Sequence, residues 1–331
     1  MRILFIGGTG IISSACSDLA LARGLDLYLL NRGKSELRPA PRGAKLLSAD
    51  ISDRHAVENA LGSLTFDAVV NFVVFTEDQI QRDIELFGKR TAQYVFISSA
   101  SAYQTPPTRL PVTESTPLHN PFWQYSRNKI ACEERLLRAH REQGFPATVV
   151  RPSHTYDRTL WPMHGGYTAV DRMRRGRPVV VHGDGTSLWT LTHHRDFAAA
   201  FVPLLGHDGA IGEAFHITSD EWLTWNQIHE IVARAAGTRA ELVHVPSEVI
   251  ATHDPEWGAS LLGDKTHSMV FDNTKIKRLV PDYRASIPFS QGVHEIVGFY
   301  DQNPQHRQID RELDRLMDKL IDSQVRERRA L

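Results

Sequence analysis

The N-terminus of this 331-residue chain constrains its fold more than any other segment. Apolar residues 3–6 are followed directly by a glycine turn, with Gly7 and Gly10, and then by a helical pattern. Gly7 permits the tight turn, Gly10 lets a pyrophosphate approach the backbone, and the helix directs its free N–H groups at the anion. Ser13 occupies the third position, where glycine is usual, and still permits close helix–strand packing. Because the turn directly follows an apolar strand, the sequence predicts dinucleotide binding rather than a chance turn.

Short apolar runs alternate with longer amphipathic segments up to residue 151. A strand followed by a helix, repeated, implies right-handed crossovers and a parallel sheet. The runs are apolar throughout, which is typical of strands covered on both faces. The predicted strands are 2–6, 26–31, 44–48, 68–72, 94–98 and 147–151. The predicted helices are 13–23, 54–61, 76–88 and 125–143.

The alternation breaks after Arg151, which divides the chain. We expect an α/β fold with a Rossmann-type, doubly wound parallel sheet in residues 1–151 and a smaller substrate-binding lobe in 152–303. Segments after residue 190 are expected to return to the sheet. Residues 304–331 form a charged helical pattern with apolar residues at helical spacing and basic and acidic stripes, whose bases meet acids three residues on. We interpret it as a solvated surface helix docked by one apolar seam rather than a coiled coil.

Composition excludes several classes of function. The net charge of −1 leaves no overall basic field for nucleic acid or an anionic membrane. No apolar run approaches the ~20 residues of a membrane span, and the N-terminal run is too short for a secretory signal. Cys16 and Cys132 are far apart, which excludes a disulfide framework and a cysteine zinc site, so we expect a cytoplasmic protein. His193-His194 lacks a paired histidine one turn away and a third ligand, so no metal is expected.

Tyr125 and Lys129 are spaced to share one face of a helix. A hydride-transfer enzyme needs an acid or base that cycles near neutral pH, and a tyrosine with a pKa near 10 is a weak base unless a cation stabilises its phenolate. Lys129 can supply that cation and also hold the nicotinamide ribose. Ser99 ends the predicted strand 94–98, where this architecture places ligands, and can hydrogen-bond the reacting oxygen.

The second strand ends in Asn31-Arg32, without the carboxylate that would bind a ribose 2′-hydroxyl and select NAD. Asn31 does not repel a 2′-phosphate and Arg32 can pair with one, which favours NADP(H) modestly over NAD(H). Arg32 can also stack on adenine or be solvated. Asp50 can accept from the adenine amino group or serve as a loop cap before Ser52.

These motifs together resemble the extended short-chain dehydrogenases/reductases, in the NAD-dependent epimerase/dehydratase family. The resemblance covers roughly residues 1–300. It is carried by the glycine loop 7–13, the strand end 98–103, the Tyr125/Lys129 pair, and segments 151–156, 181–185, 192–197 and 271–275. Segments 31–33, 83–87 and 224–228 resemble a branch near the chloroplast stem-loop-binding proteins, which includes RNA-associated members.

The resemblance implies site residues by position. It makes Ser99, Tyr125 and Lys129 catalytic, and His154 falls where the family often has a substrate-contacting Asn, although it can equally be a packed loop histidine. Besides Tyr125 and Lys129, the cofactor would be lined by Gly7, Gly10, Ile11, Ile12, Asn31, Arg32, Asp50, Ile51, Phe72 and Val73. Family members also commonly dimerise through the helices corresponding to 76–88 and 125–143, and Ile130, Leu136 and Leu137 leave apolar surface there, so we expect a homodimer.

The departures from the family pattern narrow the reaction. Ala100-Ser101 follow Ser99 where the 4,6-dehydratase branch has an Asp-Glu pair, and the decarboxylase branch also needs a Glu nearby. We therefore expect an NAD(P)-dependent oxidoreductase of epimerase type acting on a sugar or nucleotide-sugar hydroxyl. The alternatives are a dehydrogenase or ketoreductase on a small alcohol or carbonyl, and a nucleotide- or RNA-binding scaffold without turnover. The intact Tyr125/Lys129 pair and the neutral charge argue against RNA.

Overall fold

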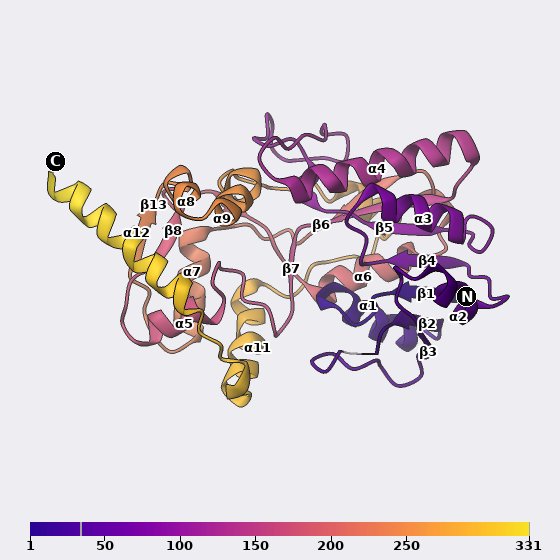
Figure 1. Cartoon of the computed structure of the whole chain (residues 1–331), viewed down its shortest axis with the longest axis horizontal. Helices are drawn as coiled ribbons and strands as arrows, with labels where there is room; N and C mark the ends of the chain where they lie inside the picture. Colours follow the sequence, from indigo (N-terminus) through magenta and orange to yellow (C-terminus); the bar gives the residue numbers. More distant parts are fainter. Residues whose placement is uncertain (34, 331) are drawn as a thin grey trace.

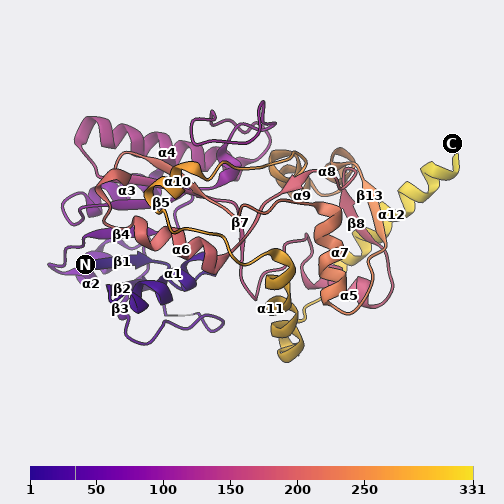
Figure 2. The same cartoon turned by 180° about the vertical axis from the view of Figure 1, so that it is seen from behind.

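A seven-stranded parallel sheet, with six strands from residues 2–152 and a seventh from residues 214–217, forms the larger part of the protein (Figures 1 and 2). The computed structural model describes residues 1–33 and 35–330, with the backbone alone for 325–330. Every neighbouring pair of strands is parallel. In spatial order the strands are β11 (Ala214–Ile217), β6 (Ala147–Pro152), β5 (Tyr94–Ile97), β4 (Ala68–Asn71), β1 (Arg2–Ile6), β2 (Asp26–Asn31) and β3 (Lys45–Ser48).

Helices cover both faces of the sheet because its strands are apolar on both sides. Ile3 and Phe5 of β1 face one core and the alternate Leu4 and Ile6 face the other, as the two-residue period of a strand requires. The first core is closed by α1 (Ile11–Ala22), α6 (His194–Leu204) and α10 (Thr274–Leu279). The second is closed by α2 (Arg54–Leu61), α3 (Glu77–Phe87) and α4 (Gln124–Gln143). The predicted Rossmann-type fold is confirmed, and each strand and helix predicted before residue 151 lies within about two residues of its expected ends.

Strand order places the ligand edge of the sheet. The chain passes from β1 to β2 on one side, and β4 lies on the other side of β1, so the order reverses at β1. Ligands of open α/β sheets bind at this switch point, outside the carboxyl ends of the strands. The glycine turn after β1 and Ser99 after β5 both follow carboxyl ends of parallel strands and therefore share this edge.

A smaller lobe follows β6, and Figure 1 shows it beside the sheet. Its strands pair two by two, β7 with β10, β9 with β12 and β8 with β13. They are β7 (His154–Tyr156), β8 (Val179–His182), β9 (Leu188–Trp189), β10 (Leu191–His193), β12 (Leu223–Thr224) and β13 (Leu242–Val245). Its helices are α5 (Tyr167–Arg174), α7 (Trp225–Ala235), α8 (Ser247–His253), α9 (Pro255–Ser260), a π-helix (Leu261–Lys265) and α11 (Phe289–Gln302). Residues 214–217 leave the lobe and form strand β11 of the sheet.

The C-terminal pattern departs from the expectation in two ways. A short 3-10 turn (Pro304–His306) precedes the helix α12 (Arg311–Ala330), so the helix does not start at Pro304. Asp314 and Asp318 form ion pairs with Arg172 and Arg177 of the lobe, so part of the acidic stripe is engaged rather than solvated. The fully buried Arg172 side chain requires these carboxylates, because a buried charge needs a partner.

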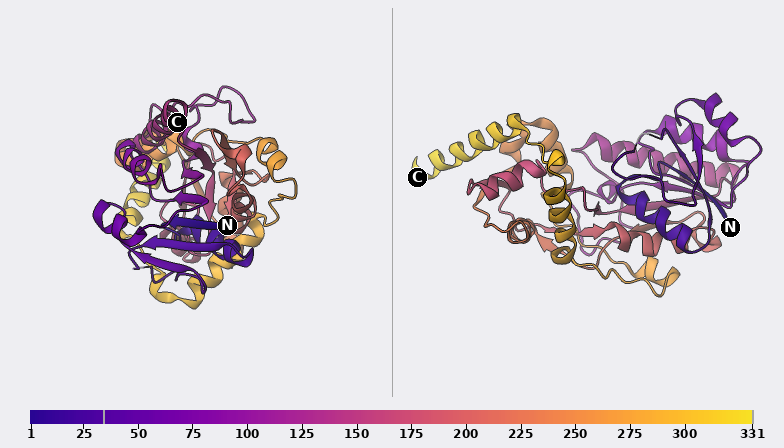
Figure 3. Two further views of the ribbon diagram at one scale, coloured as in Figure 1. Left: turned by 90° about the vertical axis from the view of Figure 1, so that its right-hand side faces the viewer. Right: turned by 90° about the horizontal axis from the view of Figure 1, so that it is seen from below.

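The apolar seam of α12 packs as predicted from its spacing. Leu320 is buried with Met317 in a cluster that also holds residues of α8 and α9, whereas Ile309 is exposed. The helix then extends away from the body, and Figure 3 shows its end opposite the N-terminus. Within residues 1–33 and 35–330, no helix combines the length and apolar character needed to cross a membrane.

Candidate active site at the sheet edge

Ser99 is held at the carboxyl end of β5 by a chain of hydroxyl groups. Its Oγ accepts from the N–H of Ser101 at 3.2 Å and lies 2.9 Å from Ser101 Oγ. Ser126 on α4 donates to Ser101 Oγ at 2.7 Å. Ser99 therefore has a fixed place relative to the helix that carries Tyr125 and Lys129.

Tyr125 lies on the first turn of α4, beside these serine hydroxyl groups. Burial raises the pKa of Tyr125, a hydrogen bond with the Ser99 side chain lowers it in part, and the Asp264 charge raises it further. The expected lowering of this pKa by Lys129 is not among these effects. A raised pKa keeps Tyr125 as a neutral phenol near neutral pH, the form that donates a proton.

Lys129 is buried one turn along α4. Its Nζ donates to the carbonyl oxygens of Val74 at 2.6 Å and Ile97 at 2.9 Å, and lies 5.7 Å from the centroid of the Tyr125 ring. An ammonium has three protons, so these two bonds orient it and leave a third for another acceptor. Burial lowers the pKa of Lys129 to about 8, although the nearby Cys132 and Glu133 raise it.

A polar network behind the strand end fixes β5 against α4. Glu133 on α4 accepts from Ser98 and forms a buried ion pair with Arg151, and the Arg151 guanidinium lies 4.8 Å from the Tyr103 ring. Because removing one partner would leave a buried charge unpaired, this network resists displacement of α4. Tyr103 Oη lies 3.0 Å from Nδ1 of His216 on β11.

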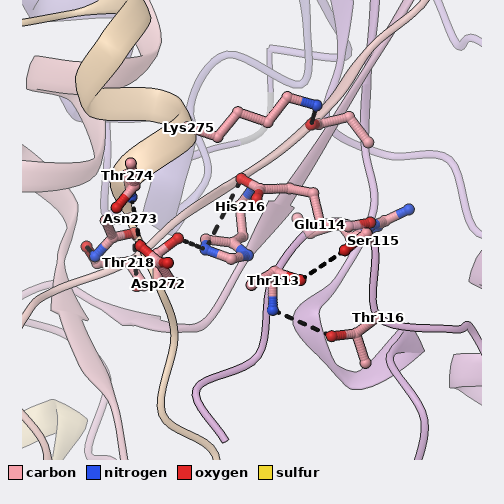
Figure 4. A network of polar contacts seen from close by, with 12 residues as sticks. Thr113, Glu114, Ser115, Thr116, His216, Thr218, Asp272, Asn273, Thr274 and Lys275 are labelled. Atoms are coloured by element: carbon pink, nitrogen blue, oxygen red, sulfur yellow. Dashed lines mark hydrogen bonds and ion pairs between the residues drawn. The ribbon is translucent and has the colours of Figure 1, made fainter.

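His216 continues the network into two loops (Figure 4). Its Nε2 lies 2.8 Å from the carbonyl oxygen of Asp272 and its backbone N–H donates to Glu114. A carbonyl only accepts, so His216 Nε2 carries the proton and Nδ1 accepts from Tyr103. Figure 4 shows His216 between the segment of Glu114 and that of Asp272, so three segments that are far apart in the sequence meet at His216.

A cavity of about 210 Å³ opens beside Ser99 and Tyr125. The sheet, α4 and the lobe all contribute to its wall. It is lined by Ser99, Ala100, Ser101, Trp123, Tyr125, Pro152, Ser153, His154, Trp189, Thr190, Asp264, Lys265, Met269 and Phe271.

His154 lines this cavity in a defined tautomer. Trp189 Nε1 donates to His154 Nδ1 at 3.2 Å, so the proton of the neutral ring is on Nε2. Burial and the positive charge of Lys265 lower the pKa of His154 to about 3, so the ring stays neutral. Of the two interpretations of His154, its place in the cavity wall favours contact with substrate over packing alone.

Asp264 and Lys265 are cavity residues that the sequence analysis missed. They end the π-helix Leu261–Lys265, and their side chains pair at 3.4 Å. Burial raises the pKa of Asp264, and Lys265 lowers it in part. The segment stands out only because it forms a π-helical turn, a feature that is frequent at functional sites. No residue pattern in the sequence predicts this turn.

The glycine turn forms a cradle that side chains would fill. Gly7 has φ +79°, and a Cβ there would lie 2.7 Å from Cγ1 of Val73. Ser13 Oγ donates to the Gly7 carbonyl and accepts from the Gly10 N–H, which holds the turn against α1. The residues present thus fit a bound pyrophosphate, and Ile11 and Ile12 open the helix that would face it.

The remaining predicted cofactor residues follow neighbouring strands. Phe72 follows β4 and packs its ring 5.3 Å from that of Phe5, so much of this side chain belongs to the core. Ile51 is partly buried against the opposite core. These positions lie along one sheet edge, as the resemblance requires.

Arg32 and Asp50 lie close together at the end of β2. Their side chains form an exposed ion pair at 3.8 Å. Asp50 also accepts from the N–H and hydroxyl of Ser52, as a loop cap does, and Asn31 accepts from the N–H of Gly33. Arg32 would have to exchange Asp50 for a 2′-phosphate, a small cost for an exposed pair.

A second contact near this end joins the sheet to the lobe. Arg38, in the loop after β2, donates to both carboxylate oxygens of the buried Asp157 and contacts Thr159. Asp157 follows β7 directly, so the loop after β2 is anchored to the end of the strand that begins with His154. No motif or residue spacing indicates this pair.

Among the described residues, no group of three or more His, Cys, Asp or Glu side chains is arranged to hold a metal ion. Cys16 and Cys132 are both buried and free.

A family model for the NAD dependent epimerase/dehydratase family matches residues 3–218, which include the glycine turn, Ser99, Tyr125 and Lys129. The chain belongs to this family. A member of the epimerase/dehydratase family binds a nicotinamide cofactor, and here the glycine cradle is where the residues fit one.

Relatives within and around the family differ in their named activities. The 2′-dehydrokanamycin reductase of Streptomyces kanamyceticus is 28% identical over 86% of this chain and 80% of its own. The chloroplast stem-loop binding protein of 41 kDa b of Arabidopsis thaliana is 28% identical over 73% of this chain and 65% of its own. The Thermus thermophilus UDP-glucose 4-epimerase, solved with NAD, superposes with a TM-score of 0.71 at 21% identity over 92% of this chain and 100% of that one. This structural likeness shows the fold alone.

Proposed function

We propose that this epimerase/dehydratase family member is an oxidoreductase of epimerase type that acts on a secondary hydroxyl of a sugar. The observation that carries the proposal is that Ser99 and Tyr125 line the wall of one cavity, with Lys129 buried one turn away from Tyr125. These are the groups that proton transfer to and from a sugar hydroxyl needs.

Each residue has a separate task in this proposal. The phenolate form of Tyr125 takes the proton from the substrate hydroxyl, and the phenol so formed returns it to the carbonyl oxygen, while Ser99 Oγ hydrogen-bonds that oxygen. Lys129, oriented by two backbone carbonyls, stabilises the phenolate and holds the cofactor ribose. When bound, the nicotinamide supplies hydride acceptance and return. Return to the opposite face of the sugar carbon gives an epimer, and release of the ketone gives net oxidation.

Net reduction of a ketone is the second candidate. It is favoured by the raised pKa of Tyr125, which keeps Tyr125 protonated and able to donate its proton, and by the similarity to 2′-dehydrokanamycin reductase. Stoichiometry separates the two candidates. An epimerase converts many equivalents of sugar with catalytic amounts of cofactor, whereas a reductase consumes one NAD(P)H for each product, followed at 340 nm as an absorbance change.

Cofactor choice is tested by two substitutions. Arg32→Ala should weaken NADP(H) by about tenfold and leave NAD(H) nearly unchanged, since a charge-assisted bond is worth ~1.5–3 kcal/mol before solvent screening reduces it. Asn31→Asp should shift the preference to NAD(H). Fluorescence titration of both cofactors at fixed ionic strength measures this. Strong NAD(H) selectivity that Arg32→Ala leaves unmoved would show that Arg32 has no part in cofactor choice.

We also propose a homodimer formed through α3 and α4. Of the three apolar residues expected to support it, Leu136 is fully buried in its own core, and this part of the argument is wrong. Leu137 remains 41% exposed, and Phe75 and Phe122 near the same helices are exposed as well. Light scattering at micromolar concentration should give twice the monomer mass, and Leu137→Glu should reduce it. A monomer in the unmutated protein would contradict the proposal.

A further inference from the structure

The cavity beside Tyr125 has walls of two kinds. Hydroxyl groups and the ring of His154 give the lining its hydrogen-bonding groups. The indole rings of Trp123 and Trp189 flank the Lys265 ammonium, at 5.4 and 5.7 Å from their centroids. Aromatic faces beside hydrogen-bonding groups suit a ring with an apolar face and several hydroxyls, which is the chemistry of a pyranose.

The charge in this cavity is balanced. Lys265 is the one formal cation among the described residues that line it, because His154 is neutral. Its ammonium already pairs with Asp264 at 3.4 Å and lies against both tryptophans. The lining therefore has no excess positive charge that would attract an anion.

A nucleotide sugar would present a diphosphate to this lobe. Proteins bind such groups with several arginines or lysines, or with backbone N–H groups at helix N-termini. One ammonium beside a carboxylate does not meet that need, and Asp264 repels a phosphate directly.

We propose that the cavity selects a phosphate-free sugar, such as a simple glycoside, and discriminates against nucleoside diphosphate sugars. The inference rests on the proposed function, since it names the substrate class of the same site. The Asp264–Lys265 pair is the specificity determinant, because it hydrogen-bonds sugar hydroxyls while cancelling the charge that would attract phosphate. Trp189 supplies the stacking face.

Binding to the cofactor-saturated protein tests the proposal without any turnover. Calorimetric titrations would compare UDP, UDP-glucose and methyl glycosides of glucose, galactose, mannose and glucosamine. We expect at least one methyl glycoside to bind at least as tightly as UDP-glucose. UDP-glucose bound about tenfold tighter than all four glycosides, or failure of all four to bind, would overturn the proposal.

The charge pair provides the decisive comparison. Asp264→Asn leaves Lys265 unbalanced and should tighten UDP-glucose by about tenfold, whereas Lys265→Met leaves Asp264 unbalanced and should weaken it further. Unchanged UDP-glucose affinity in both variants would show that the pair does not set charge selectivity. Unaltered cofactor affinity and melting temperature check that each variant is folded.

Trp189→Ala tests the stacking face, and Trp222→Ala is its matched control because Trp222 is 53% exposed and does not line the cavity. Glycoside affinity should fall about tenfold in the first and stay unchanged in the second. Equal affinities in both variants would contradict the role of Trp189. Because these are binding measurements, normal sugar selectivity without hydride transfer would refute the proposed function and leave this inference standing.

Discussion

Replacing Tyr125 with phenylalanine should lower kcat by at least about 10²-fold, the usual contribution of a positioned general acid–base group. The ring remains, so its packing against Trp123 at 4.8 Å between centroids and cofactor binding should both persist. Stopped-flow or steady-state absorbance at the nicotinamide band measures the rate, and calorimetry measures cofactor affinity.

Tyr167→Phe is the matched control, because Tyr167 is a buried tyrosine of the lobe that does not line the cavity. It loses the same hydroxyl group and should keep nearly full activity. Normal turnover by Tyr125→Phe would refute its role as the proton-transfer group. Absence of turnover in the unmutated protein would instead favour the scaffold interpretation, in which the protein binds nucleotides or RNA without catalysis.

Lys129→Met should damage both steps that Lys129 serves, with kcat lowered about 10²-fold and cofactor affinity lowered as well. The unmutated enzyme should also show a pH dependence from this residue. Burial lowers the pKa of Lys129 to about 8, so its ammonium is present below that pH and is lost as the pH rises through it. Without the cation, the phenolate that forms when Tyr125 gives up its proton loses its stabilisation. In the direction of ketone reduction, kcat/KM should therefore fall above about pH 8.

The pH profile distinguishes this role from simple packing. Lys129→Met should be slow across the range and should lack the decline near pH 8, since the titrating group is gone. A decline near pH 8 of equal size in Lys129→Met would assign it to another group. Lys319→Met, on the distant helix α12, should leave both the rate and the profile unchanged.

Local sequence patterns were sufficient to predict the secondary-structure elements of the sheet domain. Strands and helices up to residue 151 follow from hydrophobic period, and the glycine turn follows from the need for φ +79° at Gly7. The spacing of Tyr125 and Lys129 on one helix face is also local. These features depend on neighbours within a few residues, and a sequence displays such neighbours directly.

The cavity and the inter-lobe contacts depended on folding. Lys265 reaches Trp123, Trp189 and His154 only because the π-helix of the lobe packs against the end of the sheet. The same holds for the bond from Arg38 to Asp157.

The C-terminal helix shows the physical reason for this division. Its sequence determines an amphipathic helix with charged stripes, and the spacing of the stripes predicts ion pairs within the helix. The structure instead pairs Asp314 and Asp318 with Arg172 and Arg177, which lie far away in the chain. The acidic side chains of α12 can pair with bases on the same helix or with bases of the lobe. They pair with the buried Arg172, because leaving a buried charge unpaired is more unfavourable than losing an exposed ion pair within the helix. The sequence by itself therefore determined the elements and the candidate catalytic pair, and the tertiary structure decided which charges meet and what surrounds the site.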